Sequence, residues 1–481
     1  MVVKELRQGL RSKSFVVAFL LLQGLLVTAT FVAIGGSGDY TEALNYGIGN
    51  AFIGVLAIVL LIALPIRSLI SIHQESESDT LELLEMTRVG ALRIVTGKWL
   101  SLSAMAVLAV VAAIPYFMLR YFVGGVELLQ ELLLIGTLLF SSVVLCAIGV
   151  CLSATVGRRG RHALWILTLL VGGWALWAFI WLPAERGESF GWIASWTSFF
   201  TTIGIGGFIL FYALCAGATR IAPVAQNLST IKRATSLGAA TLFCVFSLIE
   251  NWGTGSFGTI DWVVVVMLLV VFSMSDALCE RPSGLTSVLR PFSKGPIRRV
   301  LAWIFAPGWP TGIIYSIVCM IVFGIAITSR TIDGDDWLPY WLLFSMVLMP
   351  AAVIRIAMKR DDDILGIFVV MQVIGLAILV AGVLLDSSIG DLHAYRFLAI
   401  IPHAAVLLST FNMFSDDGFS PLYWSIGIGY TLISIGLLLL KGRGHFQEMS
   451  RRFLQISFDQ SQRFRPPNLN SSPLPPNHPD A

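Results

Sequence analysis

Charged residues are scarce in this sequence. They make up 13% of the 481 residues, whereas hydrophobic residues make up 56% and the mean hydropathy is +0.81. Soluble domains carry roughly 25% charged residues. Most of the surface of this chain therefore cannot face water, so the composition excludes an ordinary soluble domain and favours a membrane protein.

Motifs for metal, disulfide or nucleotide chemistry are also missing. None of the six cysteines forms a C-x-x-C pair, and no stretch reads H-E-x-x-H. The stretch GALRIVTGKW fails as a phosphate loop, because Leu92 stands where a glycine is needed and Trp99 where a hydroxyl residue is needed. The three aspartates at 361–363 could hold Mg²⁺, but we expect a charged loop end there. We therefore expect no metal, no cofactor and no ATP in this chain.

Long apolar runs predict an all-α, polytopic transmembrane bundle of about twelve spans. About 20 helical residues cross the hydrocarbon core, where only a helix satisfies its own backbone hydrogen bonds. The first run follows a basic N-terminus, as in a signal peptide, but its length favours a retained span. Residues 394–412 contain Pro402 and His403 and are interpreted as a re-entrant or interfacial hairpin. The predicted spans are residues 15–34, 47–70, 100–119, 128–156, 163–182, 200–219, 236–250, 261–278, 312–328, 339–357, 364–385 and 421–440.

The distribution of basic residues predicts the orientation of these spans. With the N-terminus inside, 28 of the 32 lysines and arginines lie in inner segments, and only Arg120, Arg186, Arg330 and Arg396 lie outside. Inner loops of membrane proteins carry an excess of Lys and Arg. We therefore expect a multi-pass protein of the plasma or inner membrane with both termini in the cytoplasm.

Loop lengths suggest an internal repeat. They run 12, 29, 8, 6 and 17 residues between the first six spans, and 10, 33, 10, 6 and 35 between the last six. Matching loop order predicts two six-helix units in parallel orientation, a known transporter plan. The predicted organisation is an interfacial helix at 1–14, a first unit at 15–219, a cytoplasmic linker at 220–235, a second unit at 236–440 and a cytoplasmic segment at 441–481.

The N-terminal segment is amphipathic. Val3, Leu6 and Leu10 share one helical face, and neighbouring basic residues can reach lipid headgroups. This pattern predicts a short helix along the inner leaflet. An ordinary basic flank of the first span is the alternative.

A second amphipathic segment lies near the C-terminus, at residues 445–465. Its apolar residues share one helical face and its arginines lie opposite, so we expect it at the membrane surface. The apolar residues are Phe446, Met449, Phe453 and Ile456, and the arginines are Arg451 and Arg452. Residues 466–481 hold six prolines and are expected to be a disordered tail.

The segment 73–98 is the strongest candidate site. Acidic residues concentrated in its first half precede basic ones, and Asp79 or Thr80 can cap a short helix. Such a helix beside a membrane span can dock a soluble partner through its acidic face. The alternative is a solvated loop helix without a partner.

The N-terminal segment and the segment 73–98 resemble the permease subunits of export-type ABC transporters. The resemblance covers about residues 1–235, and the second half of the chain shares only the layout. It departs from the usual pattern at Asp79 and Arg88, where a Gly and a Pro are common. The matching residues are Glu5-Leu6, Arg11-Ser12-Lys13-Ser14-Phe15, Glu75, Glu77, Thr80-Leu81-Glu82-Leu83-Leu84, Thr87, Ile94-Val95 and Gly97-Lys98, with weaker support from residues 222–230.

The resemblance implies that residues 1–14 form a connecting helix and that 73–98 is a coupling loop. This loop would contact a separate ABC ATPase subunit, which would bind the ATP, while this chain forms the translocation path and is no enzyme itself. The other expected partner is membrane lipid, with no nucleic acid. The ATPase-coupling residues would be Glu75, Glu77, Thr80, Leu81, Glu82, Leu84, Gly97 and Lys98.

Other functions stay open beside this one. An ion-coupled secondary transporter usually holds an ionisable residue near mid-membrane, whereas Arg67, Glu131, Glu250, Asp276 and Arg355 all lie near span ends. A polytopic membrane transferase is a less favoured alternative. Family permeases usually form dimers of six-helix subunits, so this chain is either an internal pseudo-dimer or one half of a homodimer. Drugs, lipids, polysaccharides and peptides all stay open as cargo.

Overall fold

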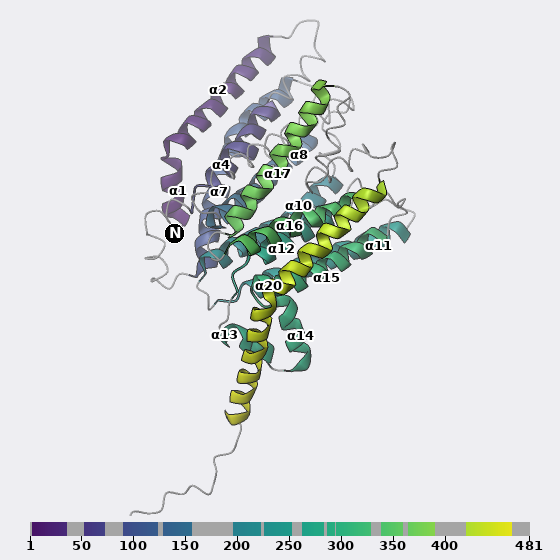
Figure 1. The fold of residues 1–481 in the computed structure, drawn as a ribbon. Coiled ribbons are helices and arrows are strands. Elements are labelled where there is room, and N and C mark those ends of the chain that lie inside the picture. The colour runs from purple at the N-terminus through teal and green to yellow at the C-terminus, as the bar shows by residue number, and fades with distance from the viewer. Residues whose placement is uncertain are drawn as a thin grey trace, which may run out of the picture.

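The computed structural model of this chain is built from helices (Figure 1). No strand occurs among the residues that it describes, which confirms the all-α fold class. The predicted span 163–182, the predicted hairpin 394–412 and the predicted tail 466–481 lie outside them. The described residues are 2–35, 52–72, 90–123, 128–155, 196–222, 226–252, 262–282, 286–293, 295–328, 338–358, 364–389 and 420–463.

The helices follow one another along the chain with the following bounds. In the first part they are α1 (Val2–Leu10), α2 (Lys13–Gly35), a helix over residues 52–58 that continues through η1 (Val59–Ala63) into α4 (Leu64–Ser68), α7 (Ala91–Val123), α8 (Leu128–Thr155) and α10 (Trp196–Ile221). In the second part they are α11 (Ser229–Trp252), α12 (Trp262–Cys279), α13 (Thr286–Leu289), η2 (Arg290–Ser293), α14 (Pro296–Phe305), α15 (Trp309–Thr328), α16 (Leu338–Ala357), α17 (Ile364–Ile389) and α20 (Ser420–Arg463).

Several of these helices are long and apolar enough to cross a membrane, as expected of a multi-pass membrane protein. Within the described residues there are six, and a bent pair formed by α1 and α2 gives a seventh. Shorter apolar helices cover Phe52–Ser68, Val265–Cys279, Leu342–Ala357 and Ile364–Gly375. Every predicted span other than 163–182 overlaps a helix of the described residues. The six helices that are long and apolar enough to cross a membrane are Ala91–Leu119, Glu131–Ala154, Ile203–Ile221, Ser229–Ile249, Trp309–Ile327 and Ser425–Ile456.

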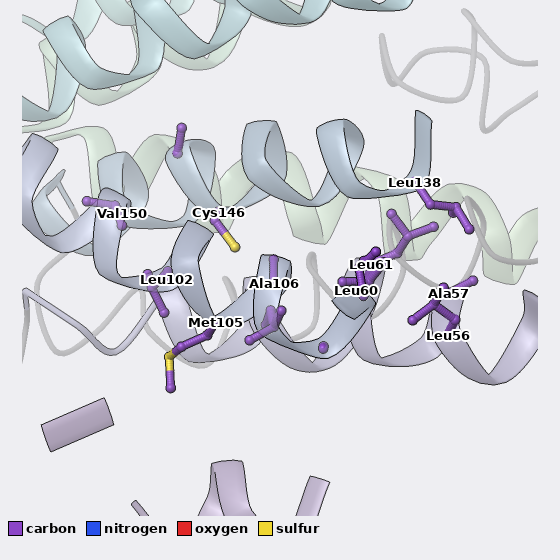
Figure 2. Packing of buried hydrophobic residues seen from close by; sticks show 14 of the residues in the cluster. Leu56, Ala57, Leu60, Leu61, Leu102, Met105, Ala106, Leu138, Cys146 and Val150 are labelled. Carbon is purple, nitrogen blue, oxygen red and sulfur yellow. The ribbon is translucent and has the colours of Figure 1, made fainter. Parts of the chain in front are cut away.

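Buried apolar side chains form two large clusters. The first runs from Phe15 to Ile221 and the second from Ala240 to Leu438. Figure 2 shows part of the first cluster, in which side chains come from the helix over residues 52–68, from α7 and from α8. Small residues such as Ala57, Ala106 and Ala147 are fully buried in it. Small side chains let helices approach closely, which is how membrane helices gain packing energy without a hydrophobic drive between them.

The helix over residues 52–68 widens at η1, and the cause is Pro65. The Leu64 N–H donates to the oxygen of Val59, five residues back. Pro65 has no N–H, so it cannot donate the next bond of this kind to the Leu60 oxygen. The Ser142 hydroxyl of α8 donates to that oxygen instead, at 2.7 Å.

The C-terminal helix α20 runs without a break through the predicted span 421–440 and on to Arg463, below the bundle in Figure 1. Phe453 and Ile456 are buried against residues Leu289 and Ala302. Phe446 lies against Trp303, with ring centroids 5.5 Å apart. The apolar face that the sequence places at the membrane surface therefore packs on protein, against α13 and α14.

Candidate coupling site at the α1 end of the bundle

Helix α1 lies at one end of the bundle, and a sharp bend joins it to α2. The two helices meet at 62°. Ser12 makes the bend: its hydroxyl donates to the Gly9 oxygen at 2.8 Å and accepts from the Phe15 N–H at 3.4 Å. Leu6 and Leu10 pack against the first apolar cluster, and Val3 is exposed. The amphipathic helix predicted at the N-terminus is therefore present, with most of its apolar face on protein.

Arg67, near the end of α4, holds α1 in place. Its guanidinium donates to the Gly9 oxygen at 2.9 Å and lies 5.8 Å from the centre of the Phe15 ring. The last carbonyls of a helix have no partner within the helix and carry partial negative charge. Arg67 therefore closes the carboxyl end of α1 with a charge of the favourable sign.

Lys98, in the first turns of α7, connects three segments at this end. Its side chain is buried, and its ammonium donates to the Ser71 oxygen at 3.0 Å. The same ammonium lies 3.6 Å from a carboxylate oxygen of Glu5 in α1. Of the eight predicted coupling residues the structure describes two, Gly97 and Lys98, and both are buried. Lys98 contacts its own chain here rather than pointing to the outside.

The other six predicted coupling residues lie between 73 and 89, outside the described residues. The structure does describe the two ends of this segment. The bond from Lys98 to the Ser71 oxygen ties α7 to the turn before this segment, and the Ile72 N–H donates to the hydroxyl of Ser153 in α8 at 3.0 Å. Lys98, the last residue of the predicted coupling segment 73–98, is therefore tied to Ser71, which lies just before that segment, and to α1.

A second group of charges, which was not predicted from the sequence, lies at the same end of the bundle. Gly217 of α10, a turn before Arg220, packs against Cys151 of α8. Beyond that contact, six charged residues from four helices and one loop are buried together or nearly so. We call them the charged junction; they are Arg220, Lys232, Arg233, Asp276, Glu280 and Arg355.

Asp276 of α12 joins α10 to the second part of the chain. It pairs with Arg220 of α10 at 2.8 Å and with Lys232 of α11. The hydroxyl of Tyr212 in α10 also donates to it, at 3.1 Å. This carboxylate therefore connects three helices, one of which belongs to the first apolar cluster.

Glu280 follows the last residue of α12 and receives two further cations. Lys232 lies 3.1 Å away and Arg233 2.6 Å away. The Gly308 N–H also donates to it, at 3.2 Å. Burial alone raises the pKa of a carboxyl group, but Lys232 and Arg233 outweigh it and lower the pKa of Glu280 to about 2. Glu280 is therefore ionised at neutral pH.

Backbone oxygens balance the two surplus positive charges of the junction. Arg233 donates to the oxygens of Ala306 at 2.8 Å and Gly308 at 2.9 Å. Arg355 donates to the oxygens of Leu278 and Glu280, at 2.9 and 3.1 Å, at the carboxyl end of α12. Unpaired carbonyls at helix ends attract cations. The junction thus fixes how α12 ends and how α14 turns into α15.

The junction organises the fold more than it adds stability. Taking charges out of water costs several kcal/mol per ion, so a buried ion pair often contributes little net stability. Removing one partner is costly, however, because the other charge is left buried.

One feature of the sequence indicated the charged junction. Asp276 and Glu280 are four residues apart on one face, an arrangement that is unfavourable unless cations lie between them.

Nothing in the described residues points to bound cofactors. No three His, Cys, Asp or Glu side chains there are grouped to hold a metal, and all six cysteines are free. The aspartates at 361–363 lie outside the described residues.

Comparisons with protein-family models, with curated proteins and with solved structures give no match. The fold and the site define a multi-pass helical membrane protein with two groups of buried charge at one end of its bundle.

Proposed function

We propose that this chain is the permease of an ATP-driven ABC exporter and that a separate ATPase subunit docks on residues 73–98. The observation that carries the proposal is the fixed base of this segment. Lys98 joins its two ends and contacts Glu5 of α1. A force applied to the segment therefore passes directly to α1 and α7, as coupling to a motor subunit requires.

The charges of the segment suit a protein partner. Glu75, Glu77, Glu82 and Glu85 precede the first basic residue, Arg88. Acidic and basic surfaces that face each other speed association and select the partner. The chain has no phosphate loop, so the proposal places ATP on the partner subunit.

The proposed orientation puts the α1 end and both termini in the cytoplasm. The excess of basic residues in the predicted inner segments supports it. On this orientation the charged junction lies at the inner membrane surface, where an ion-rich cluster costs less than at mid-membrane.

Co-purification from the native membrane tests the proposal. We expect an ATPase subunit to be recovered with the chain, and the double reversal Glu75→Lys with Glu77→Lys to reduce its recovery. The variant Ser76→Lys with Ser78→Lys is the matched control, since it adds positive charge between the same carboxylates but retains them. Transport by the purified chain alone, without any nucleotide-binding partner, would overturn the proposal.

Two six-helix units in one chain would supply both halves of the translocation path. The two apolar clusters support this arrangement, since one draws on residues up to Ile221 and the other on residues from Ala240 onward. One copy of the chain would then pair with two ATPase subunits. The mass of the purified complex distinguishes this pseudo-dimer from a homodimer, in which two copies are present and residues 236–440 are accessory.

A further inference from the structure

Helix α14 exposes an apolar stripe that no described part of the chain covers. Ile297, Val300 and Leu301 are 74%, 62% and 39% exposed. Their spacing of three and four residues places them on one side of the helix. Three exposed aliphatic side chains in a single short helix form an unusual surface for contact with water.

The opposite side of α14 is held against the protein. Ala302 is fully buried in a cluster with Leu289 and Phe453, and Trp303 packs on Phe446. The apolar stripe is therefore not a face that could turn inward by rotation of α14. It points away from the helices that hold it.

The location of α14 favours lipid as its neighbour. Only three residues separate it from α15, a candidate membrane span that begins at Trp309. Its last turn is tied to the first turn of α11, where the Thr230 hydroxyl donates to the Phe305 oxygen at 3.0 Å. Helix α11, also a candidate span, exposes apolar residues from its first turn onward, including Ile231 and Leu242. Helix α14 is thus joined at its carboxyl end to two candidate membrane spans, one of which has exposed apolar side chains.

The charge of α14 also favours lipid as its neighbour. Arg298 and Arg299 are exposed on α14, within the same two turns as the apolar stripe. Long basic side chains on the polar side of an interfacial helix extend to the headgroup layer while apolar side chains enter the acyl boundary. Each arginine near an anionic surface adds attraction of about 1 kcal/mol, which is about fivefold in occupancy.

We infer that α14 is an interfacial helix that binds the membrane surface through anionic phospholipid. Ile297, Val300 and Leu301 enter the boundary between headgroups and acyl chains, and Arg298 and Arg299 contact phosphate groups. The helix then fixes the depth at which α15 enters the bilayer. This inference does not depend on the identity of the transported cargo or on an ATPase partner.

The test uses a nitroxide label on the full chain, reconstituted in vesicles of phosphatidylcholine with phosphatidylglycerol. The label is placed at Val300→Cys, with Leu242→Cys as the lipid-facing reference and Ser450→Cys as the water-facing reference. The native cysteines are buried or half-buried, and the unchanged chain gives the background. Collision rates with oxygen and with a water-soluble nickel chelate report the surroundings of each label.

We expect the label at position 300 to behave like the one at 242, with frequent oxygen collisions and few nickel collisions. Replacing both Arg298 and Arg299 by Gln should shift it toward the values at 450, and the shift should be larger in vesicles with phosphatidylglycerol than in phosphatidylcholine alone. Nickel access at position 300 equal to that at 450 would overturn the inference. Protection that appears only when a soluble protein fraction is added would also overturn it, because a protein would then be the occupant.

Discussion

The ammonium of Lys98 donates a hydrogen bond to the backbone oxygen of Ser71 at 3.0 Å, across 27 residues of chain. The bond ties together the two ends of the predicted coupling segment 73–98, and the contact of Lys98 with Glu5 brings α1 to the same point. A buried lysine here has a mechanical role, because it joins one loop to two helices. It also explains why a coupling residue suggested by resemblance has its side chain inside the protein.

Replacing Lys98 by Met should release this tie while keeping the length of the side chain. A hydrogen bond from a charged group contributes about 1.5–3 kcal/mol, so amide hydrogen exchange at residues 69–72 should become faster. If the proposed function holds, ATPase-driven transport should fall as well. Arg93→Met is the control, because Arg93 is exposed one turn earlier on α7. Equal exchange rates in the two variants would contradict a closing role for Lys98.

Glu280 should make stability sensitive to acid. Its pKa is lowered from 4.5 to about 2 in the folded protein, so its ionised form stabilises the fold above pH 4.5. That contribution is lost as the pH falls through the folded value. Thermal unfolding in detergent should therefore show a smaller loss of stability between pH 5 and pH 3 for Glu280→Gln than for the unchanged chain. Glu280→Gln should also be less stable at neutral pH by about 3–5 kcal/mol, because Lys232 and Arg233 stay buried.

The control for this prediction is Glu448→Gln. Glu448 forms an exposed pair with Arg452 within α20. Exposed pairs contribute about 0–1 kcal/mol, so this variant should follow the acid response of the unchanged chain. Parallel pH profiles for Glu280→Gln and the unchanged chain would show that Glu280 is not the group responsible.

Two glycines of α15 should respond in opposite directions to alanine. A Cβ at Gly312 would clash with the Ala277 oxygen of α12, whereas one at Gly324 meets nothing within 4 Å. Backbone cannot yield easily, so Gly312→Ala should cost about 1–3 kcal/mol. Gly324→Ala should be neutral or add up to about 1 kcal/mol, because alanine favours helix. Melting temperatures in detergent test the pair, and equal values would mean that α12 and α15 are not packed this closely.

Truncating Phe453 should loosen the contact between α20 and α14. Phe453 is 6% exposed, while its neighbour Leu454 is 66% exposed. Replacing a buried Phe by Ala costs about 3–5 kcal/mol, whereas Leu454→Ala should change stability by less than about 0.5 kcal/mol. Trypsin should then cleave after Arg298 and Arg299 faster in Phe453→Ala. Equal cleavage in both variants would indicate that α20 does not hold α14 in place.

The positions of the helices followed from the sequence because the length of an apolar run is a local property. A run such as 364–385 must be helical to satisfy its backbone in lipid, and α17 covers it. The N-terminal helix was predictable for the same reason, since Val3, Leu6 and Leu10 repeat with the helical period. The count of twelve spans and the two-unit layout stay predictions, as does the docking role of residues 73–98.

Only the tertiary structure decided which partner each polar or apolar face has. Arg233, Glu280 and Arg355 are far apart in the chain. The local sequence around each shows only a basic or acidic residue near a helix end. Their shared burial depends on three helix ends meeting at one point, which no local pattern encodes. The apolar face of residues 446–456 has the periodicity of a membrane-surface helix, and an identical pattern fits a protein neighbour. The presence of α14 beside it decides between the two, because side-chain packing selects its partner by shape and not by hydrophobicity alone.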